Sequence, residues 1–267
     1  MARIGLLFPV MAPIAAENYG EPPTYGEGFI VGKAVSAEKS ITANNNPLYG
    51  DDAVAESDTS FASGTLTLGV TDFGTTKESS LAIQAKMLGH RLVTENGVEV
   101  LRKSSSDEAP YLGTGYYKTK KIRGEKFYEA TWLWKTQYQE PSESANTKGQ
   151  SIEWQTPTIT GSIMLVEGMD GDTWEDTAVF STKQEAENWL RRRANIAIAV
   201  NKDALKASIQ TAEGKDPESY TSESYALMYV ALLAAQNTAA NEYAGQMDVN
   251  AADTALTNAV SQLAERS

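Results

Sequence analysis

Residues 127–138 read FYEATWLWKTQY, a run in which aromatic and polar side chains largely alternate. Successive side chains of a β-strand point to opposite faces, so this alternation predicts a long strand with one buried face. The side chains expected on the buried face are Tyr128, Trp132, Trp134 and Tyr138. Those expected on the other face are Glu129, Thr131, Lys135 and Gln137, with Leu133 as one apolar exception.

Strand-like alternation of apolar and polar residues also occurs on both sides of this run, up to about Phe180. Residues 61–71, FASGTLTLGVT, place Leu66, Leu68 and Val70 on one face. Shorter strands are predicted within GFIVGKAVS (28–36), GVEVLRK (97–103) and EDTAVF (175–180). β-branched and aromatic residues dominate these runs, and Gly, Asn, Asp and Pro separate them. This part of the chain therefore predicts a mainly β fold, a sandwich or a barrel.

Residues 151–164, SIEWQTPTITGSIM, contain a change of phase. The apolar residues are Ile152 and Trp154 before the proline, then Ile159 and Ile163 after it. A shift of one residue turns the buried face over, so a bulge or bend is expected near Thr156 and Pro157. Residues 139–150, which include SESANTKGQ, have few apolar side chains and predict a mobile loop.

Helical patterns occur later in the chain. In TKQEAENWLRRR (182–193), Thr182 and Glu185 form a predicted capping box, and three arginines suit the negative end of a helix dipole. This is the one packed helix expected in a β-rich domain of residues 1–197. Residues 198–267 predict three helices with short connections, a small antiparallel bundle.

Composition narrows the functional classes. The chain has 267 residues, a formal net charge of −12, no cysteine and one histidine. The acidic excess disfavours nucleic-acid binding because like charge repels phosphate. The missing cysteines exclude disulfides and thiolate chemistry. His90 follows the apolar run LAIQAKMLG and is expected to be a surface or helix-end residue rather than a catalytic one.

No motif for catalysis, a cofactor or a metal is found. The sequence has no Walker-type phosphate loop, HExxH, nucleophile elbow or CxxC. The stretch EGMDGDTWED, with Asp170, Asp172, Glu175 and Asp176, fails the EF-hand spacing and predicts an acidic turn. We therefore expect no enzyme, no catalytic, cofactor-binding or metal-binding residue, and no cofactor.

The N-terminal segment is expected to be an extended arm. Pro9 and Pro13 interrupt the apolar run that a signal peptide would need, and no span suited to a membrane follows. Residues 1–25 then form a proline-punctuated arm of an intracellular product. Such an arm buries its apolar side chains by lying on something else, for example a neighbouring copy.

Two long segments resemble a known family. They are NNNPLYGDDAVAESDTSFASGTLTLGVTDF (44–73) and the segment 109–164, with its GYYKTK, YEATWLWK and EPSESANTKGQSIEWQTPTI runs. Together they resemble the major tail (tail tube) proteins of long-tailed phages, over roughly residues 2–190. The resemblance implies a β-sandwich-like subunit of stacked, hexameric rings that form the tube through which DNA passes. It also implies assembly in the host bacterial cytoplasm and residence in the phage tail of the virion.

The family resemblance also implies partners and a candidate surface. The expected partners are other copies of the chain, and tail proteins such as the tape measure and the tail terminator. Contact with genomic DNA would be transient, since a negative wall lets DNA slide. The candidate acidic residues of the lumen are Asp51, Asp52, Glu56 and Asp58. The alternative is that these carboxylates belong to a solvated loop.

The C-terminal part resembles a FIVAR-type three-helix module. The matching segments are 205–241 and 249–263, with Thr221 at a helix entry, Ser224 one turn on, and the spacing of Asp253 and Leu256. The resemblance implies display on the tail exterior and contact with host-surface glycans. Candidate sugar-stacking side chains are Tyr225, Tyr229 and Tyr243; the alternative is helix packing.

The two resemblances together imply a structural virion protein without a membrane partner, a tail tube subunit that carries a helical bundle. The alternative is a cell-surface adhesin or carbohydrate-binding β-sandwich joined to a helical spacer. A third reading, an acid–base enzyme that uses scattered carboxylates, has no motif to support it.

Overall fold

The computed structural model describes residues 2–44, 46–50, 53–58, 60–122, 124–141, 156–198, 200–241 and 244–266. The chain divides into two compact units, Met1–Ile196 and Ala197–Ser267, here called the β unit and the helical unit. The division lies one residue from the expected boundary between residues 197 and 198.

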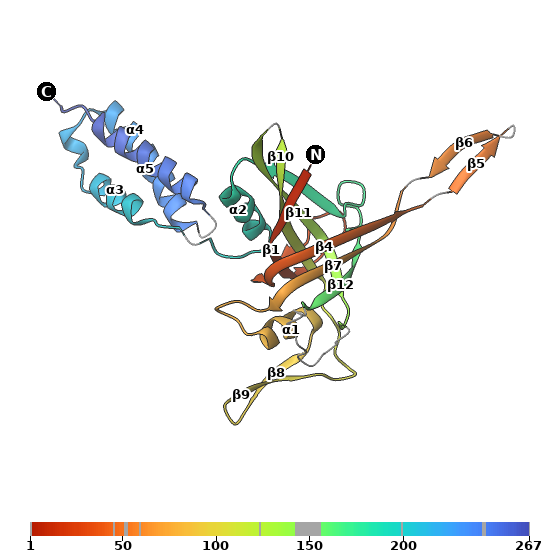
Figure 1. The fold of residues 1–267 in the computed structure, drawn as a ribbon. Coiled ribbons are helices and arrows are strands. Elements are labelled where there is room, and N and C mark those ends of the chain that lie inside the picture. Colours follow the sequence, from red (N-terminus) through yellow and green to blue (C-terminus); the bar gives the residue numbers. More distant parts are fainter. Residues whose placement is uncertain are drawn as a thin grey trace. The chain divides into compact units, whose positions relative to one another are not determined.

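The β unit is built on an antiparallel sheet of nine strands (Figure 1). The strands are β1 (Ala2–Ala16), β2 (Thr24–Tyr25), β3 (Phe29–Ile30), β4 (Gly32–Ala43), β7 (Phe61–Phe73), β10 (Leu112–Ile122), β11 (Glu125–Tyr138), β12 (Thr158–Met164) and β13 (Glu175–Phe180). Two further hairpins pair separately: β5 (Asn46–Gly50) with β6 (Ala53–Asp58), and β8 (Arg91–Glu95) with β9 (Val98–Arg102).

The strand order lets the sheet return on itself. Neighbouring strands follow the order β2-β1-β10-β11-β12-β7-β4. Strand β3 pairs with β1 and is separated from β4 by a single residue, so the path of paired strands leads back to β1. The predicted mainly β fold of sandwich or barrel type is confirmed.

A first hydrophobic core, the inner core, is enclosed by these strands. Its fully buried members include Met11, Leu66, Tyr116, Leu133 and Ile159. Helix α1 (Ser80–Leu88) adds Ile83, Met87 and Leu88 to it. Ser79 caps this helix, and Gly89 ends it in the left-handed conformation at φ 73°. The prediction of a single packed helix in this part was wrong, because α1 is a second one.

A second core, the outer core, lies between the sheet and helix α2 (Lys183–Arg193). Ala186 and Leu190 of α2 pack there with Trp132 and Tyr117. The predicted capping box is confirmed, since the Thr182 hydroxyl accepts a hydrogen bond from the backbone N–H of Glu185 and the Glu185 carboxylate accepts one from that of Thr182. The helix therefore begins where the sequence predicts.

Strand β11 buries both of its faces, which corrects the prediction of one apolar face. Trp132 and Trp134 belong to the outer core, whereas Leu133 belongs to the inner core. The register with β10 shifts between Leu112 and Thr114, and this irregularity turns the later residues over. Tyr138 therefore lies in the inner core, on the face of Leu133 rather than that of Trp132.

The N-terminal segment is extended, and it lies on its own chain. Strand β1 pairs with β10, and Val10, Met11 and Ala12 are fully buried. At the predicted bend, β12 begins directly after Pro157, and Ile159 and Ile163 are buried. Ile152, Trp154 and residues 142–150 of the predicted mobile loop lie outside the described residues.

The helical unit contains the three predicted helices. They are α3 (Asp203–Glu213), α4 (Ser222–Ala240) and α5 (Gln246–Ser261), with a 3-10 turn, η1 (Pro217–Ser219), between the first two. Their shared core includes Leu205, Met228, Leu232, Val249 and Leu256. As predicted, Thr221 caps α4 by accepting a hydrogen bond from the Ser224 N–H.

Candidate functional site

Two of the candidate acidic residues of a lumen, Glu56 and Asp58, belong to strand β6 of the β5–β6 hairpin. This hairpin follows β4 and precedes β7, and Figure 1 shows it as a ribbon that continues away from the sheet. In the described part of the hairpin, β5 and β6 pair with each other, with Glu56 opposite Leu48 and Asp58 opposite Asn46. Asp51 and Asp52 lie outside the described residues.

The candidate sugar-stacking side chains fall in the helical unit. Tyr225 and Tyr229 stack on each other with ring centroids 6.5 Å apart and an interplanar angle of 15°. Tyr229 is 48% exposed, whereas Tyr225 packs partly against the helical core. Tyr243, the third candidate, lies outside the described residues. The structure thus brings two of the three together.

These tyrosines border a shallow hollow of about 360 Å³. Its other lining residues are Pro217, Glu218, Ser222, Ala226 and Arg266. The guanidinium of Arg266 lies 3.2 Å from a carboxylate oxygen of Glu218. The C-terminal segment is held in place there, because the N–H of Arg266 donates to the carbonyl of Ser219 over 3.0 Å. An aromatic face bordered by one cation and one anion can stack on a ring and bond to its polar substituents.

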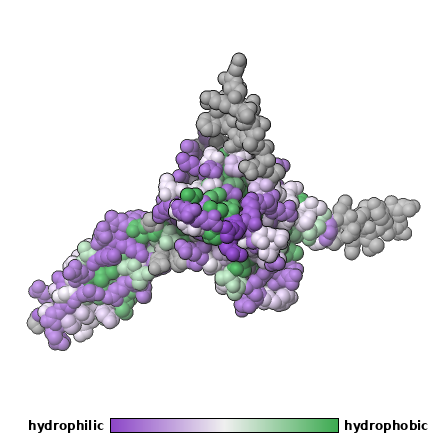
Figure 2. Space-filling model, turned by 90° about the horizontal axis from the view of Figure 1, so that it is seen from below, coloured by the Kyte–Doolittle hydropathy of each residue, from purple (hydrophilic) through white to green (hydrophobic). Residues whose placement is uncertain are grey.

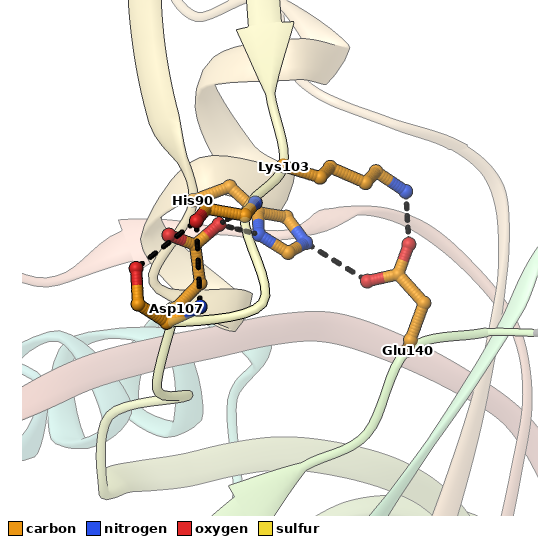
Figure 3. A network of polar contacts seen from close by, with 6 residues as sticks. His90, Lys103, Asp107 and Glu140 are labelled. Atoms are coloured by element: carbon orange, nitrogen blue, oxygen red, sulfur yellow. Dashed lines mark hydrogen bonds and ion pairs between the residues drawn. The ribbon is translucent and has the colours of Figure 1, made fainter.

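A third constellation surrounds the single histidine (Figure 3). Nδ1 of His90 lies 2.9 Å from Oδ2 of Asp107, and Nε2 lies 2.8 Å from Oε2 of Glu140. The other carboxylate oxygen of Glu140 accepts a hydrogen bond from Lys103. Each ring nitrogen thus faces a carboxylate oxygen, which accepts a hydrogen bond from whichever nitrogen carries a proton. His90 follows the Gly89 cap of α1, so of the two expected positions, the surface or a helix end, the structure shows the helix end.

The electrostatics of this network favour charged carboxylates. The hydrogen bond from His90 and the backbone N–H of Ser104 lower the pKa of the Asp107 carboxyl. Burial raises the pKa of Glu140, but the hydrogen bonds from Lys103 and His90 outweigh it and leave the pKa below its usual range. The network therefore ties three segments together: the residue after α1, the loop after β9 and the end of β11.

Sequence reasoning placed His90 but missed its partners. Asp107 and Glu140 are 17 and 50 positions away from His90, and no local pattern marks either of them. Asp170 and Asp172 lie in a turn with positive φ, where Asp172 accepts a hydrogen bond from the Gly168 N–H over 2.7 Å. Throughout the described residues, no group of three or more acidic or histidine side chains is arranged to hold a metal ion.

Within the described ranges, no helix is both long enough and apolar enough to cross a bilayer.

Comparison with known proteins does not assign the chain to a family. Neither a protein-family model nor a curated protein matches the sequence. Two solved structures of the CBM51-2 and INT domains of ZmpB from Clostridium perfringens are similar to the chain, one of them in complex with GlcNAc. The first has 13% identity and a TM-score of 0.27, and it covers 77% of this chain and 52% of that one. The second has 14% identity and a TM-score of 0.27, with coverages of 86% and 55%.

The chain thus spans about half the length of these two structures. At these TM-scores the similarity carries no argument about function, which therefore rests on the residues themselves.

Proposed function

We propose that this protein is a structural virion protein, a subunit of a phage tail tube that conducts DNA. In this proposal, copies assemble in the host bacterial cytoplasm as stacked, hexameric rings, and the helical unit is displayed on the tail exterior. No catalytic step is assigned to it. The resemblance of residues 2–190 to major tail proteins supports the proposal, as does the barrel-like β unit.

The β5–β6 hairpin is the observation that carries the proposal. Its described strands pair with each other, beyond the point where Ala43 of β4 pairs with Phe61 of β7. A two-stranded hairpin by itself is marginally stable in water, so it gains from contact with another surface. A neighbouring copy would supply that surface in a ring or between rings.

A free sheet edge adds to this argument. Strand β13 pairs with β11, and no second strand partner for it occurs in the part of the chain that the structure describes. Its Val179 is 53% exposed. Unpaired strand edges are ready templates for pairing with another chain. The β unit therefore offers two surfaces that neighbouring subunits could cover.

Electron microscopy of the concentrated, purified protein tests the proposal. We expect rings or tubes from the full chain. A variant in which a short turn replaces residues 45–59 is expected to stay monomeric and keep the circular dichroism of the folded β unit. Persistent monomers of the full chain at high concentration would contradict the proposal.

The hollow beside Tyr225 and Tyr229 favours a second candidate function. In that case the protein is a carbohydrate-binding or adhesive module with a helical spacer. Binding of the full chain to a glycan array would support this function if Tyr229→Ala abolishes the binding. The control is Tyr19→Ala, at an exposed tyrosine of the β unit, which should keep it. Absence of glycan binding together with tube formation would exclude it.

A further inference from the structure

Helix α4 carries an apolar stripe on its outward side. Leu227 is 65% exposed, Val230 66% and Leu233 44%. Ala226 and Ala234 beside them are also exposed. These five residues, here called the α4 stripe, recur at spacings of three and four positions and so form one face of the helix. Figure 2 shows apolar patches between hydrophilic residues on the helical unit.

The core of the helical unit does not account for this stripe. The side of α4 that packs against α3 and α5 uses Met228, Leu232 and Ala235, which are buried. The helix is thus apolar on its outer side as well. A helix that is apolar all round is typical of one that is covered on all sides.

The distribution of charge indicates which kind of surface could pack against the α4 stripe. The helical unit has more Asp and Glu than Lys and Arg, yet α4 has no charged side chain after Glu223. A partner selected by charge would find nothing on the stripe to bind. Two copies of an acidic unit, however, could approach each other here without placing carboxylates face to face.

The order of residues in the stripe is symmetric about Val230. Ala226 and Leu227 precede it by four and three positions, and Leu233 and Ala234 follow it at three and four. An antiparallel helix pair with a twofold axis at Val230 places Leu227 of one copy against Leu233 of the other and Ala226 against Ala234, so side chains of equal size meet. Such a contact is isologous, since the same patch serves both copies. The flanking alanines allow the two helices to lie close together.

From this symmetry and this absence of charge, we propose that the α4 stripe binds the α4 stripe of a second copy in antiparallel orientation. The contact is independent of the tail tube assignment. A single helix pair covers much less than the roughly 1,600 Å² of a standard interface, so the association of free chains is weak. Covalent trapping is therefore the appropriate test.

Cysteine substitution gives that test, because the chain has no cysteine of its own. In the full chain, Val230→Cys lies on the proposed axis, and mild oxidation is expected to link two copies by a disulfide. Glu223→Cys and Asn237→Cys lie seven positions to either side, so each is about 21 Å along the helices from its own copy. That separation exceeds the reach of a disulfide, which needs Cα atoms within about 7 Å. Neither variant should link to itself, whereas a mixture of the two should form the mixed dimer.

Each outcome decides for or against the antiparallel pair. Val230→Cys chains that stay monomeric under oxidation would overturn it, and so would self-linking of Glu223→Cys, which indicates a parallel pair. Adding Leu227→Glu to Val230→Cys should slow linking by at least about tenfold, as an apolar contact is replaced by repulsion. Val98→Glu, at an exposed valine of β9, is the matched control and should leave the rate unchanged. Circular dichroism confirms that each variant is folded.

Discussion

The Nδ1 atom of His90 lies 2.9 Å from the Oδ2 atom of Asp107. This contact joins the residue that follows α1 to the loop that follows β9. With Glu140 on the opposite nitrogen, the histidine fastens three segments of the β unit at one point. Its side chain is only 9% exposed, so these hydrogen bonds are largely shielded from water.

Replacing His90 should loosen those segments. Glutamine cannot reach both carboxylates, so we expect His90→Gln to lower the free energy of unfolding by about 1–3 kcal/mol. Hydrogen exchange should become faster in residues 103–108 and 139–141. The amides of α3 and α5 serve as an internal control and should be unaffected. Unchanged protection of residues 103–108 would show that the network does not hold them.

The low pKa of Asp107 predicts an acid-dependent contribution to stability. Because this carboxyl has a lower pKa in the folded chain than in the unfolded one, its stabilising effect is complete above the unfolded value of about 4 and is lost as the pH falls below it. Asp107→Asn should therefore be less stable than the parent protein at pH 7. The difference, measured by urea unfolding, should shrink at pH 3. A difference that is constant or grows toward pH 3 would contradict the assignment.

Gly115 is a position where a methyl group does not fit. A Cβ atom there would lie 2.7 Å from Cδ2 of Leu190 and 2.7 Å from Cε3 of Trp132. We expect Gly115→Ala to destabilise the protein by about 1–3 kcal/mol, because both neighbours belong to the packed outer core. Gly214→Ala is the control, since nothing lies closer than 3.6 Å to the added atom. Thermal unfolding of the two variants should separate them clearly.

Deleting residues 201–267 tests the independence of the β unit. All members of the inner and outer cores precede residue 197, so the truncated chain should keep its β structure. Under the proposed function, it should also form tubes that electron microscopy cannot distinguish from those of the full chain except in outer diameter. Loss of tubes on this deletion would show that the helical unit contributes to assembly.

Lysines in place of Asp51 and Asp52 test the proposed lumen. If these side chains face the channel, the double variant adds contacts to phosphate and should slow genome release without preventing assembly. Ejection kinetics of phages that carry the variant measure this effect, with Glu223→Lys on α4 as the control for altered charge. Unchanged ejection kinetics would show that Asp51 and Asp52 do not face the channel.

The helices and strands that the sequence predicted correctly are those marked by residues close together in the chain. The alternation in residues 61–71 gave strand β7, and the Thr182–Glu185 pair gave the start of α2. The change of pattern after residue 200 gave the three helices. Each depends on side chains within a few positions of one another, which a sequence displays directly.

The remaining features depend on distant parts of the chain. Tyr138 changes face because of an irregularity opposite Leu112, and His90 meets carboxylates far away in sequence. Helix α1 was missed because its nine residues, SLAIQAKML, resemble a short apolar run more than an amphipathic helix. The placement of Asp51, Asp52, Glu56 and Asp58 in a lumen remains a prediction from the family resemblance.

The position of β1 has a consequence for biosynthesis. Ala2 pairs with Lys121, so the first strand leaves the ribosome 119 positions ahead of its neighbour in the sheet. Until that neighbour is translated, Val10 and Met11 can pair with Ile30 and Phe29 of β3 but lack their partners in β10, and loop closure over the longer distance is slow. A nascent chain therefore cannot present a finished barrel before most of the β unit has emerged. Formation of the complete sheet is thereby coupled to the synthesis of most of the β unit.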